Sequence, residues 1–312
     1  MMRAVFLDAG SLGLSDLDTA QLDALAIDLT CYETTRPDQV QARVKDATVI
    51  LTNKVVLDET VLSQASHCKY IGITATGMNN VDLTVCERRG ITVRNVAGYG
   101  TDAVAQHTLM LLLNLAARFV DYYQDVRAGK WSQSPHFCRL DHPVTELAGK
   151  HAVIVGHGAL GQRVEQLFAA LGMQVSIAAR PGNADDPRPP LKDLLPDADV
   201  LSLHCQLSEH TRAMVNAALL AKVKPGCLLI NTARGGLIDE AALLDALDSG
   251  RLGGAALDVL SQEPPPEDHP LLQYDKPNLL ITPHNAWVAT ASRQRLLNSV
   301  VSQLSDFIAQ PQ

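Results

Sequence analysis

The chain has 312 residues, 46% of them hydrophobic, and Asp plus Glu outnumber Lys plus Arg by 34 to 26, which gives a net charge of -8. A chain of this length divides more readily into two domains than it forms one core. The acidic balance, without a basic stripe, argues against nucleic acid or an anionic membrane as the main partner. The expected partner is therefore a small soluble molecule.

The cysteines and the length of the apolar runs indicate the cellular compartment to expect. The six cysteines form no C-x-x-C pair, which favours reduced thiols over disulfides or a zinc site, so no metal is expected. The first residues include Asp8, and no run approaches the ~18 uninterrupted apolar residues of a membrane span. We therefore expect a cytoplasmic protein with neither a signal peptide nor a membrane-spanning segment.

In the first hundred residues, short β-rich runs alternate with amphipathic segments. This alternation predicts β-α units and a parallel sheet. Helix starts are indicated by Pro37 after two threonines and by Asp58, whose side chain can accept from free backbone amides. The predicted strands are "RAVFLD" (3–8), "ATVILT" (47–52), "KYIGIT" (69–74) and "ITVRNV" (91–96).

A long apolar helix is predicted from Thr101 to a stop at Gly129, and its apolar faces must be buried or shared with another subunit. A second β-α series opens at His151. We therefore expect an α/β protein of two domains, one spanning 1–99 plus the returning helix of 286–312, the other spanning 100–285. The strands of the second series are "HAVIVG", "QVSIAAR", "DVLSLHC", "GCLLINT", "GGAALDV" and "NLLITPH".

The stretch "HAVIVGHGALGQRVEQLFAALG" places Gly156, Gly158 and Gly161 in G-x-G-x-x-G spacing between a strand and a helix. Glycines there let the backbone turn tightly and let a pyrophosphate approach helix amides that carry partial positive charge. The pattern predicts a dinucleotide site that includes Ala159 and Leu160. An ordinary glycine turn is the alternative.

The next strand ends in Ala179 and Arg180, where an acidic residue would normally hold the ribose hydroxyls of NAD. The missing carboxylate removes repulsion toward a 2′-phosphate, and Arg180 can pair with that phosphate. NADP is therefore favoured over NAD. The alternative is a solvated arginine in a Pro-Gly turn, with NAD bound less specifically.

Three later strand ends offer an arginine, two carboxylates and an imidazole. Arg234 follows "GCLLINT", Asp258 and Glu263 follow the next strand, and His284 follows "NLLITP". The combination suits hydride transfer at a 2-hydroxy acid, because a guanidinium grips a carboxylate while a histidine moves the hydroxyl proton and a glutamate stabilises the imidazolium. Taken singly, each of these residues could equally be a surface or packing residue.

The motifs "VGHGALG", "NTARGGLIDE", "ALDVLSQEP" and "TPHNAW", in this order and spacing, resemble the NAD(P)-dependent D-isomer-specific 2-hydroxyacid dehydrogenase family over essentially the whole chain. The resemblance implies two Rossmann-like or flavodoxin-like domains with parallel sheets, a cleft between them, and a homodimer built largely through the long helix. It also implies that Arg234 orients the substrate, Glu263 supports the histidine, and His284 is the acid/base.

Looser matches extend the expected site. By resemblance, the backbone near Thr76 and Gly77 in "TATGMNNVD" binds the substrate carboxylate, and Thr232, Ala233 and Asp258 contact the nicotinamide half of the cofactor. A plain strand-to-helix turn is the alternative for the first of these. The family commonly has a proline where "LHCQLSEHT" has Gln206, a departure that concerns only the local loop.

Within the family, "TNKVVLDE", "HFCRLDHPV" and "ATGMNNVD" are similar to glycerate dehydrogenases, also called hydroxypyruvate reductases. We therefore expect an oxidoreductase that acts on hydroxypyruvate or glyoxylate, giving D-glycerate or glycolate. The rival function is a dinucleotide-sensing interaction protein resembling a transcriptional corepressor, which would need no proton donor. A formate dehydrogenase-like enzyme is disfavoured, because formate has no hydroxyl to deprotonate.

Overall fold

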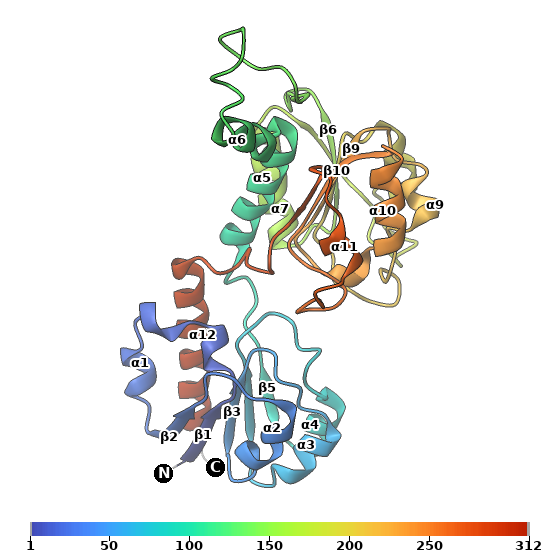
Figure 1. The fold of residues 1–312 in the computed structure, drawn as a ribbon. Helices are drawn as coiled ribbons and strands as arrows, with labels where there is room; N and C mark the ends of the chain where they lie inside the picture. Colours follow the sequence, from blue (N-terminus) through green and yellow to red (C-terminus); the bar gives the residue numbers. More distant parts are fainter. Residues whose placement is uncertain (1, 311–312) are drawn as a thin grey trace. The chain divides into compact units, whose positions relative to one another are not determined.

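The computed structural model describes residues 2–310, which form two compact units, each built on one parallel sheet (Figure 1). The first unit comprises the residues up to Gly100 together with those from Val288 onward. The second is the continuous segment Thr101–Trp287. The alternation of β-rich and amphipathic runs in the sequence thus produces the expected mixed α/β architecture.

The first unit has a five-stranded parallel sheet in the order β2-β1-β3-β4-β5, which is a flavodoxin-like order. Asp58 caps α3 as the sequence predicts, accepting from the Val61 N–H at 2.8 Å. The elements are β1 (Met2–Phe6), α1 (Ala20–Asp23), β2 (Ile27–Cys31), α2 (Pro37–Val44), β3 (Val49–Thr52), α3 (Glu59–Gln64), β4 (Tyr70–Ile73), α4 (Leu83–Arg88), β5 (Thr92–Arg94) and α12 (Thr290–Ile308).

Alternate residues of each strand face opposite sides of this sheet. Val5, Ile50 and Ile71 share one apolar core with side chains of α2, α3 and α4. On the other side, Tyr70 is fully buried and its ring lies 4.8 Å from that of Phe307 on α12. The C-terminal helix therefore completes the first unit.

The second unit has a six-stranded parallel sheet in the order β11-β10-β9-β8-β6-β7. The chain starts in the interior at β6 and runs to β7 on one side, then crosses to β8 on the other, which makes a topological switch point between β6 and β8. Its elements are α5 (Thr101–Ala117), α6 (Phe119–Arg127), β6 (His151–Val155), α7 (Ala159–Ala170), β7 (Gln174–Ile177), α8 (Leu191–Leu194), β8 (Val200–Leu203), α9 (Ala217–Leu220), β9 (Cys227–Asn231), α10 (Glu240–Asp248), β10 (Leu252–Leu257), α11 (Pro270–Gln273) and β11 (Leu279–Ile281).

Two apolar cores cover the two faces of this sheet. Val153 and Leu229 point into the core shared with α10, whereas Ile154 and Ile230 point into the core shared with α5 and α7. Figure 1 shows α5 and α7 on one side of the strands and α9, α10 and α11 on the other. This burial of both faces explains why the strands read as continuous apolar runs in the sequence.

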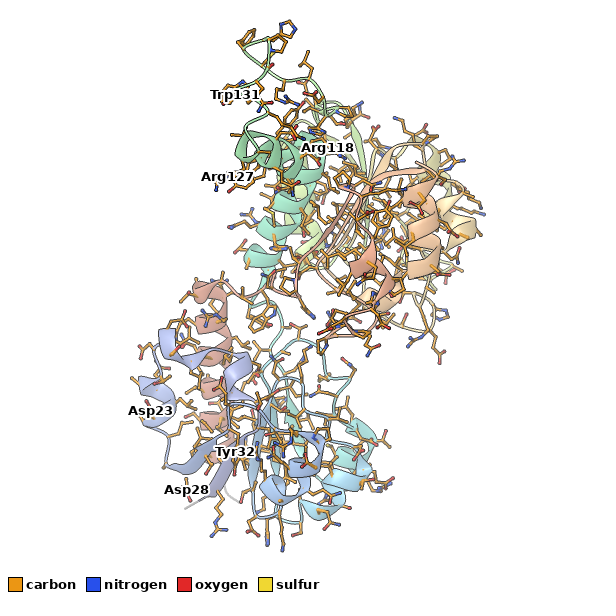
Figure 2. All side chains as sticks on the ribbon, in the orientation of Figure 1. Asp23, Asp28, Tyr32, Arg118, Arg127 and Trp131 are labelled. Atoms are coloured by element: carbon orange, nitrogen blue, oxygen red, sulfur yellow. The ribbon has the colours of Figure 1, made fainter. Side chains whose placement is uncertain are left out.

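The long helix predicted from Thr101 to Gly129 is wrong in one respect, because it breaks into α5 and α6. Arg118 adopts left-handed backbone angles (φ 51°, ψ 38°) at the break, and its Nε lies 2.7 Å from Asp121 Oδ2 in the first turn of α6. Figure 2 labels Arg118, Arg127 and Trp131 along this region. An arginine gives no signal of a helix break, so the sequence could not predict it.

The segment after α6 extends from the body of the second unit as an arm (Figure 1). Its side chains are unusually exposed for apolar residues: Phe137 is 91% exposed and Leu140 is 87% exposed. The base of the arm is held by Asp125, whose carboxylate contacts Lys130, Arg139 and His142. Residues 128–144 are called the arm.

Across residues 2–310, no single helix combines the length and the apolar character needed to cross a membrane. Taken as a pair, α5 and α6 satisfy that test by length and composition, but they meet at 63°.

Candidate active site

The glycine turn after β6 lies at the switch point of the second sheet. Gly156 has φ +95°, and a Cβ there would lie 2.5 Å from the Cys205 backbone nitrogen, so the turn can approach the end of β8 only with glycine. A Cβ on Gly161 would overlap the Gly156 carbonyl oxygen, which lets α7 pack directly on the turn. Two of the three fingerprint glycines are thus explained by contacts within the protein.

The third glycine and the start of α7 fit a pyrophosphate. A Cβ on Gly158 would have no protein atom within 4 Å. Gly158 is also the N-cap of the helix, no side chain caps it, and the first turn, which includes Ala159, Leu160 and Gly161, carries no acidic residue. The helix therefore presents uncapped N–H groups, with their partial positive charge, to open space.

A separate cavity of about 350 Å³ lies beyond β7, and its lining includes Ala179, Arg180 and the apolar Leu191 and Met214. The Arg180 N–H donates to Asp186 Oδ2 at 2.9 Å. Hydrogen bonds from the Arg188 guanidinium and from the backbone N–H groups of Arg180 and Arg188 hold the pKa of the Asp186 carboxyl well below its usual range. The carboxylate in this cavity is therefore already neutralised, and the Arg180 side chain remains exposed.

The turn that carries Arg234 is fixed by Asn231, the last residue of β9, which is fully buried. Asn231 Oδ1 accepts from the Ala233 N–H at 3.0 Å, and its Nδ2 donates to the Arg234 carbonyl at 2.8 Å. Arg234 donates one hydrogen bond, from Nη1 to the Ala233 carbonyl at 2.7 Å. The remaining guanidinium donors can therefore bind an anion.

Gly235 joins this turn to the loop after β10. A Cβ on Gly235 would overlap the carbonyl group of Leu260 and the nitrogen of Ser261. Glycine at 235 therefore allows the backbone after Arg234 to lie directly against the backbone that leads to Glu263. The two expected site residues come from different strands, and this contact brings their loops together.

Glu263 and His284 form a direct pair. His284 Nδ1 lies 2.6 Å from Glu263 Oε2, and the Leu260 N–H donates to Glu263 Oε1 at 2.9 Å. An ionised carboxylate only accepts hydrogen bonds, so Nδ1 carries the proton and Nε2 is directed to the opposite side of the ring. This is the tautomer that an acid/base acting through Nε2 requires.

The backbone of His284 is held in the left-handed region, with φ +52°, which is uncommon for a residue with a side chain. Asp258 holds the turn that imposes this conformation. Its carboxylate is 1% exposed and accepts from the Asn285 and Ala286 N–H groups, each at 3.0 Å. Within the protein, Asp258 positions His284. Its contact with the cofactor stays a prediction.

Helix α5 supports the same strand ends. The Thr282 hydroxyl donates to Asp258 Oδ1 at 2.5 Å and lies 2.9 Å from His107 Nε2. Burial lowers the pKa of His107, against the opposing effect of Asp258. Thr108, which follows His107 in α5, has its Oγ1 2.9 Å from Thr232 Oγ1. His107 thus supports the end of β11 through Thr282.

In the first unit, the loop after β4 carries Thr76 and Gly77. The Thr76 hydroxyl donates to the Val96 carbonyl at 3.0 Å, and Asn95 Nδ2 donates to the Thr76 carbonyl at 2.6 Å. The backbone N–H groups of Thr76 and Gly77 donate to no acceptor within residues 2–310. They are therefore available to a carboxylate.

Other candidate groups lie outside this constellation. His204, at the end of β8, has Nε2 2.8 Å from Ser202 Oγ, and burial lowers its pKa to about 3. All six cysteines are free, and burial raises the pKa of the Cys205 thiol to about 11. No cluster of three or more His, Cys, Asp or Glu residues within 2–310 is arranged to hold a metal ion.

The sequence did not indicate the residues that support the site. Asn231 and Thr282 fix the turns, and Asp186 with Arg188 shapes the cavity at Arg180. Asn231 does stand next to the Thr-Ala-Arg motif, where a buried amide in a turn could have been suspected. Asp186 and Arg188 lie in a loop rich in Pro and Asp and carry no pattern of their own.

The part of the chain that carries the glycine turn, Arg234, Glu263 and His284 matches a known protein family. The family model for the D-isomer specific 2-hydroxyacid dehydrogenase NAD binding domain matches residues 109–286, more than half of the chain. The chain belongs to this family. It is therefore an oxidoreductase that interconverts 2-hydroxy acids and 2-ketoacids with a nicotinamide cofactor.

Two relatives and one solved structure illustrate the similarity. The glycerate dehydrogenase of Methylorubrum extorquens is 39% identical over 89% of this chain and 88% of the relative. The hydroxypyruvate reductase of Blautia hydrogenotrophica is 37% identical over 98% of this chain and 97% of the relative. D-lactate dehydrogenase of Aquifex aeolicus, solved with NAD and lactic acid, is 28% identical with a TM-score of 0.83, covering 98% of this chain and 95% of that one. These matches give no support to the corepressor alternative.

Proposed function

We propose that this dehydrogenase reduces hydroxypyruvate or glyoxylate to D-glycerate or glycolate, and that NADPH is its favoured reductant. The observation that carries the proposal is the 2.6 Å contact between His284 Nδ1 and Glu263 Oε2, because it keeps one proton on Nδ1 and leaves Nε2 to take up and release the proton that is transferred. The names of the two relatives, glycerate dehydrogenase and hydroxypyruvate reductase, support the choice of a short hydroxylated ketoacid.

The residues divide the reaction between them. The Arg234 guanidinium pairs with the substrate carboxylate. In the first unit, the Thr76 and Gly77 N–H groups are the further donors proposed for a carboxylate. In the imidazolium form, His284 donates the Nε2 proton that converts the carbonyl oxygen to a hydroxyl and becomes the neutral Nδ1–H imidazole. Glu263 stabilises the imidazolium through Nδ1. The reduced nicotinamide, when bound, supplies the hydride to the carbonyl carbon. Alignment and charge placement then account for most of the acceleration.

The preference for NADPH is supported by the cavity beyond β7. Ala179 stands where an acid would repel a 2′-phosphate, Asp186 is paired with Arg188, and Arg180 is an exposed residue of the cavity lining. NAD bound without this discrimination is the alternative.

For Arg180→Ala, we predict that the Kd for NADPH rises by roughly ten-fold while that for NADH changes little, because only NADPH loses a charge-assisted hydrogen bond. Fluorescence titration of the reduced cofactors measures both constants. Arg251→Ala is the matched control, since Arg251 precedes β10, which is separated from β7 by β9, β8 and β6 in the sheet. Equal weakening of both cofactors by Arg180→Ala would reject the 2′-phosphate assignment.

The substrate is tested with a panel of 2-ketoacids of increasing size, each assayed with NADPH and with NADH. We expect the highest kcat/KM for hydroxypyruvate or glyoxylate and lower values for pyruvate and branched ketoacids. A best substrate with a large apolar side chain would contradict the assigned substrate class, although it would leave the acid/base pair in place.

The protein is further proposed to be a homodimer. The arm exposes Phe137 and Leu140, and α6 exposes Phe119 at 58%, a concentration of apolar surface that a second copy would cover. Sedimentation of the intact chain tests this, and a monomer at micromolar concentration would contradict it. The cytoplasm is the proposed location, in keeping with six cysteines that carry no disulfide.

A further inference from the structure

The loop that carries Glu263 is held by a second carboxylate, that of Glu240. Glu240 is the first residue of α10 and its side chain is 20% exposed. Its Oε1 accepts from the Ser261 N–H and its Oε2 accepts from the Ser261 hydroxyl, both at 2.8 Å. One carboxylate thus accepts from both hydrogen-bond donors of Ser261, which lies two positions before Glu263.

Ser261 lies between two other anchors of the same loop. The backbone of Leu260 and Ser261 packs against Gly235 so closely that a Cβ there would overlap it. The Leu260 N–H also donates to Glu263 Oε1 at 2.9 Å. The loop is therefore held both by η4 (Gly235–Leu237) and by the Glu240 carboxylate. The side chain of Glu263 is in turn bonded to the backbone of the same loop, at Leu260.

A buried histidine faces Glu240 from the other side. His269 is 7% exposed, and its Nδ1 accepts from the Leu271 N–H at 3.3 Å. Because Nδ1 is an acceptor, Nε2 carries the proton, and this nitrogen lies 3.4 Å from Glu240 Oε2. Two hydrogen bonds from Ser261 therefore hold the Glu240 carboxylate, and the His269 ring lies next to its Oε2.

We propose that Glu240 is a positioning residue for the Glu263–His284 pair. It acts through Ser261, keeping Glu263 Oε2 within hydrogen-bond distance of His284 Nδ1. The proposal rests on the function proposed above, in which that pair moves the proton. Geometry within about 1 Å decides the efficiency of such a transfer, so a loosened loop lowers turnover without touching the substrate.

The test uses Glu240→Gln in the intact protein. A glutamine presents one acceptor oxygen and an NH₂ group that opposes the second donor of Ser261, so the loop loses one anchor. We expect kcat to fall roughly ten-fold, with the Kd of the cofactor unchanged. The pH profile of kcat should change in the same direction as in Glu263→Gln. Glu267→Gln is the matched control, because it removes an exposed carboxylate from the same segment and should leave kcat unaltered.

A double-mutant cycle separates positioning from general stability. If Glu240 acts through Glu263, then Glu240→Gln added to Glu263→Gln causes little further loss of kcat. Ser261→Ala, which removes only the hydroxyl donor, should give a smaller defect of the same kind. Independent, multiplying losses in the double variant would overturn the proposal, and so would a Glu240→Gln enzyme with wild-type kcat and pH profile.

A readout without substrate or cofactor completes the test. The Nδ1 proton of His284, held at 2.6 Å from a carboxylate, should give a strongly downfield proton resonance that Glu263→Gln abolishes. We expect it to weaken or move in Glu240→Gln and to persist in Glu267→Gln. An unchanged resonance in Glu240→Gln would refute the positioning role. If Glu263→Gln and His284→Ala retain full turnover, the proposed function itself fails, which is a different outcome.

Discussion

At the scale of single residues, the site depends on side chains that bond to backbone. Asp258 holds the turn of His284, and Asn231 holds the turn of Arg234. The sequence placed Arg234, Glu263 and His284 after strand ends, because parallel strands bring their carboxyl ends to one edge. It could not show that Asp258 would be occupied by two backbone amides, since an aspartate after a strand can equally face a ligand.

His204 provides a prediction for a single residue. Its pKa is lowered to about 3 by burial, whereas in the unfolded chain it is about 6.5, so the unfolded state binds a proton that the folded state does not. The contribution to stability is fully present above pH 6.5 and is lost as the pH falls below that value.

The unfolding free energy should therefore fall between pH 7.5 and pH 5.5, and this fall should be smaller for His204→Gln than for the wild type by about 1 kcal/mol. Urea unfolding of both proteins at the two pH values measures it. Glutamine retains a polar atom near Ser202 Oγ, so the comparison is between neutral side chains. Identical pH dependence in the two proteins would show that His204 takes up its proton in the folded state.

At the scale of elements, the site is made where the turn after β9 meets the loop after β10. Both strands were predicted from the sequence, and the small residues of the turn are visible in it. It could not predict that Gly235 is the point of contact, because Gly235 and Gly236 look alike in the motif. The same limit applies to the break at Arg118, where a helix-favouring sequence continues through a left-handed residue.

The two glycines make a matched pair of variants. Gly235→Ala should lower kcat at least ten-fold, because the new Cβ meets the backbone of Leu260, which must move together with Glu263. Gly236→Ala should be milder, since its Cβ meets only the end of the Leu207 side chain, at 3.0 Å. Steady-state kinetics on both variants decides this. Equal kinetics would mean that the contact at Gly235 does not position Glu263.

At the scale of the whole molecule, alternation of strands and helices was enough to predict two parallel α/β units. It did not predict the edge strand β2, whose residues are exposed or half-buried and carry little apolar pattern. The arm after α6 lay outside any periodicity as well, and its Phe137 and Leu140 are exposed in the single chain. The dimer proposed above would cover them. Sequence periodicity reports burial within a chain, so surfaces completed by another chain remain invisible to it.

The role of His284 is tested most directly by measuring ketoacid reduction and cofactor binding on the same His284→Ala preparation. We predict that turnover falls by at least about 100-fold, while the Kd for the reduced cofactor stays within about two-fold, because only the proton donor is removed. His67→Ala, which alters an exposed histidine of the first unit, should behave like the wild type. Turnover retained in His284→Ala would contradict the assignment of His284, paired with Glu263, as the acid/base of this dehydrogenase.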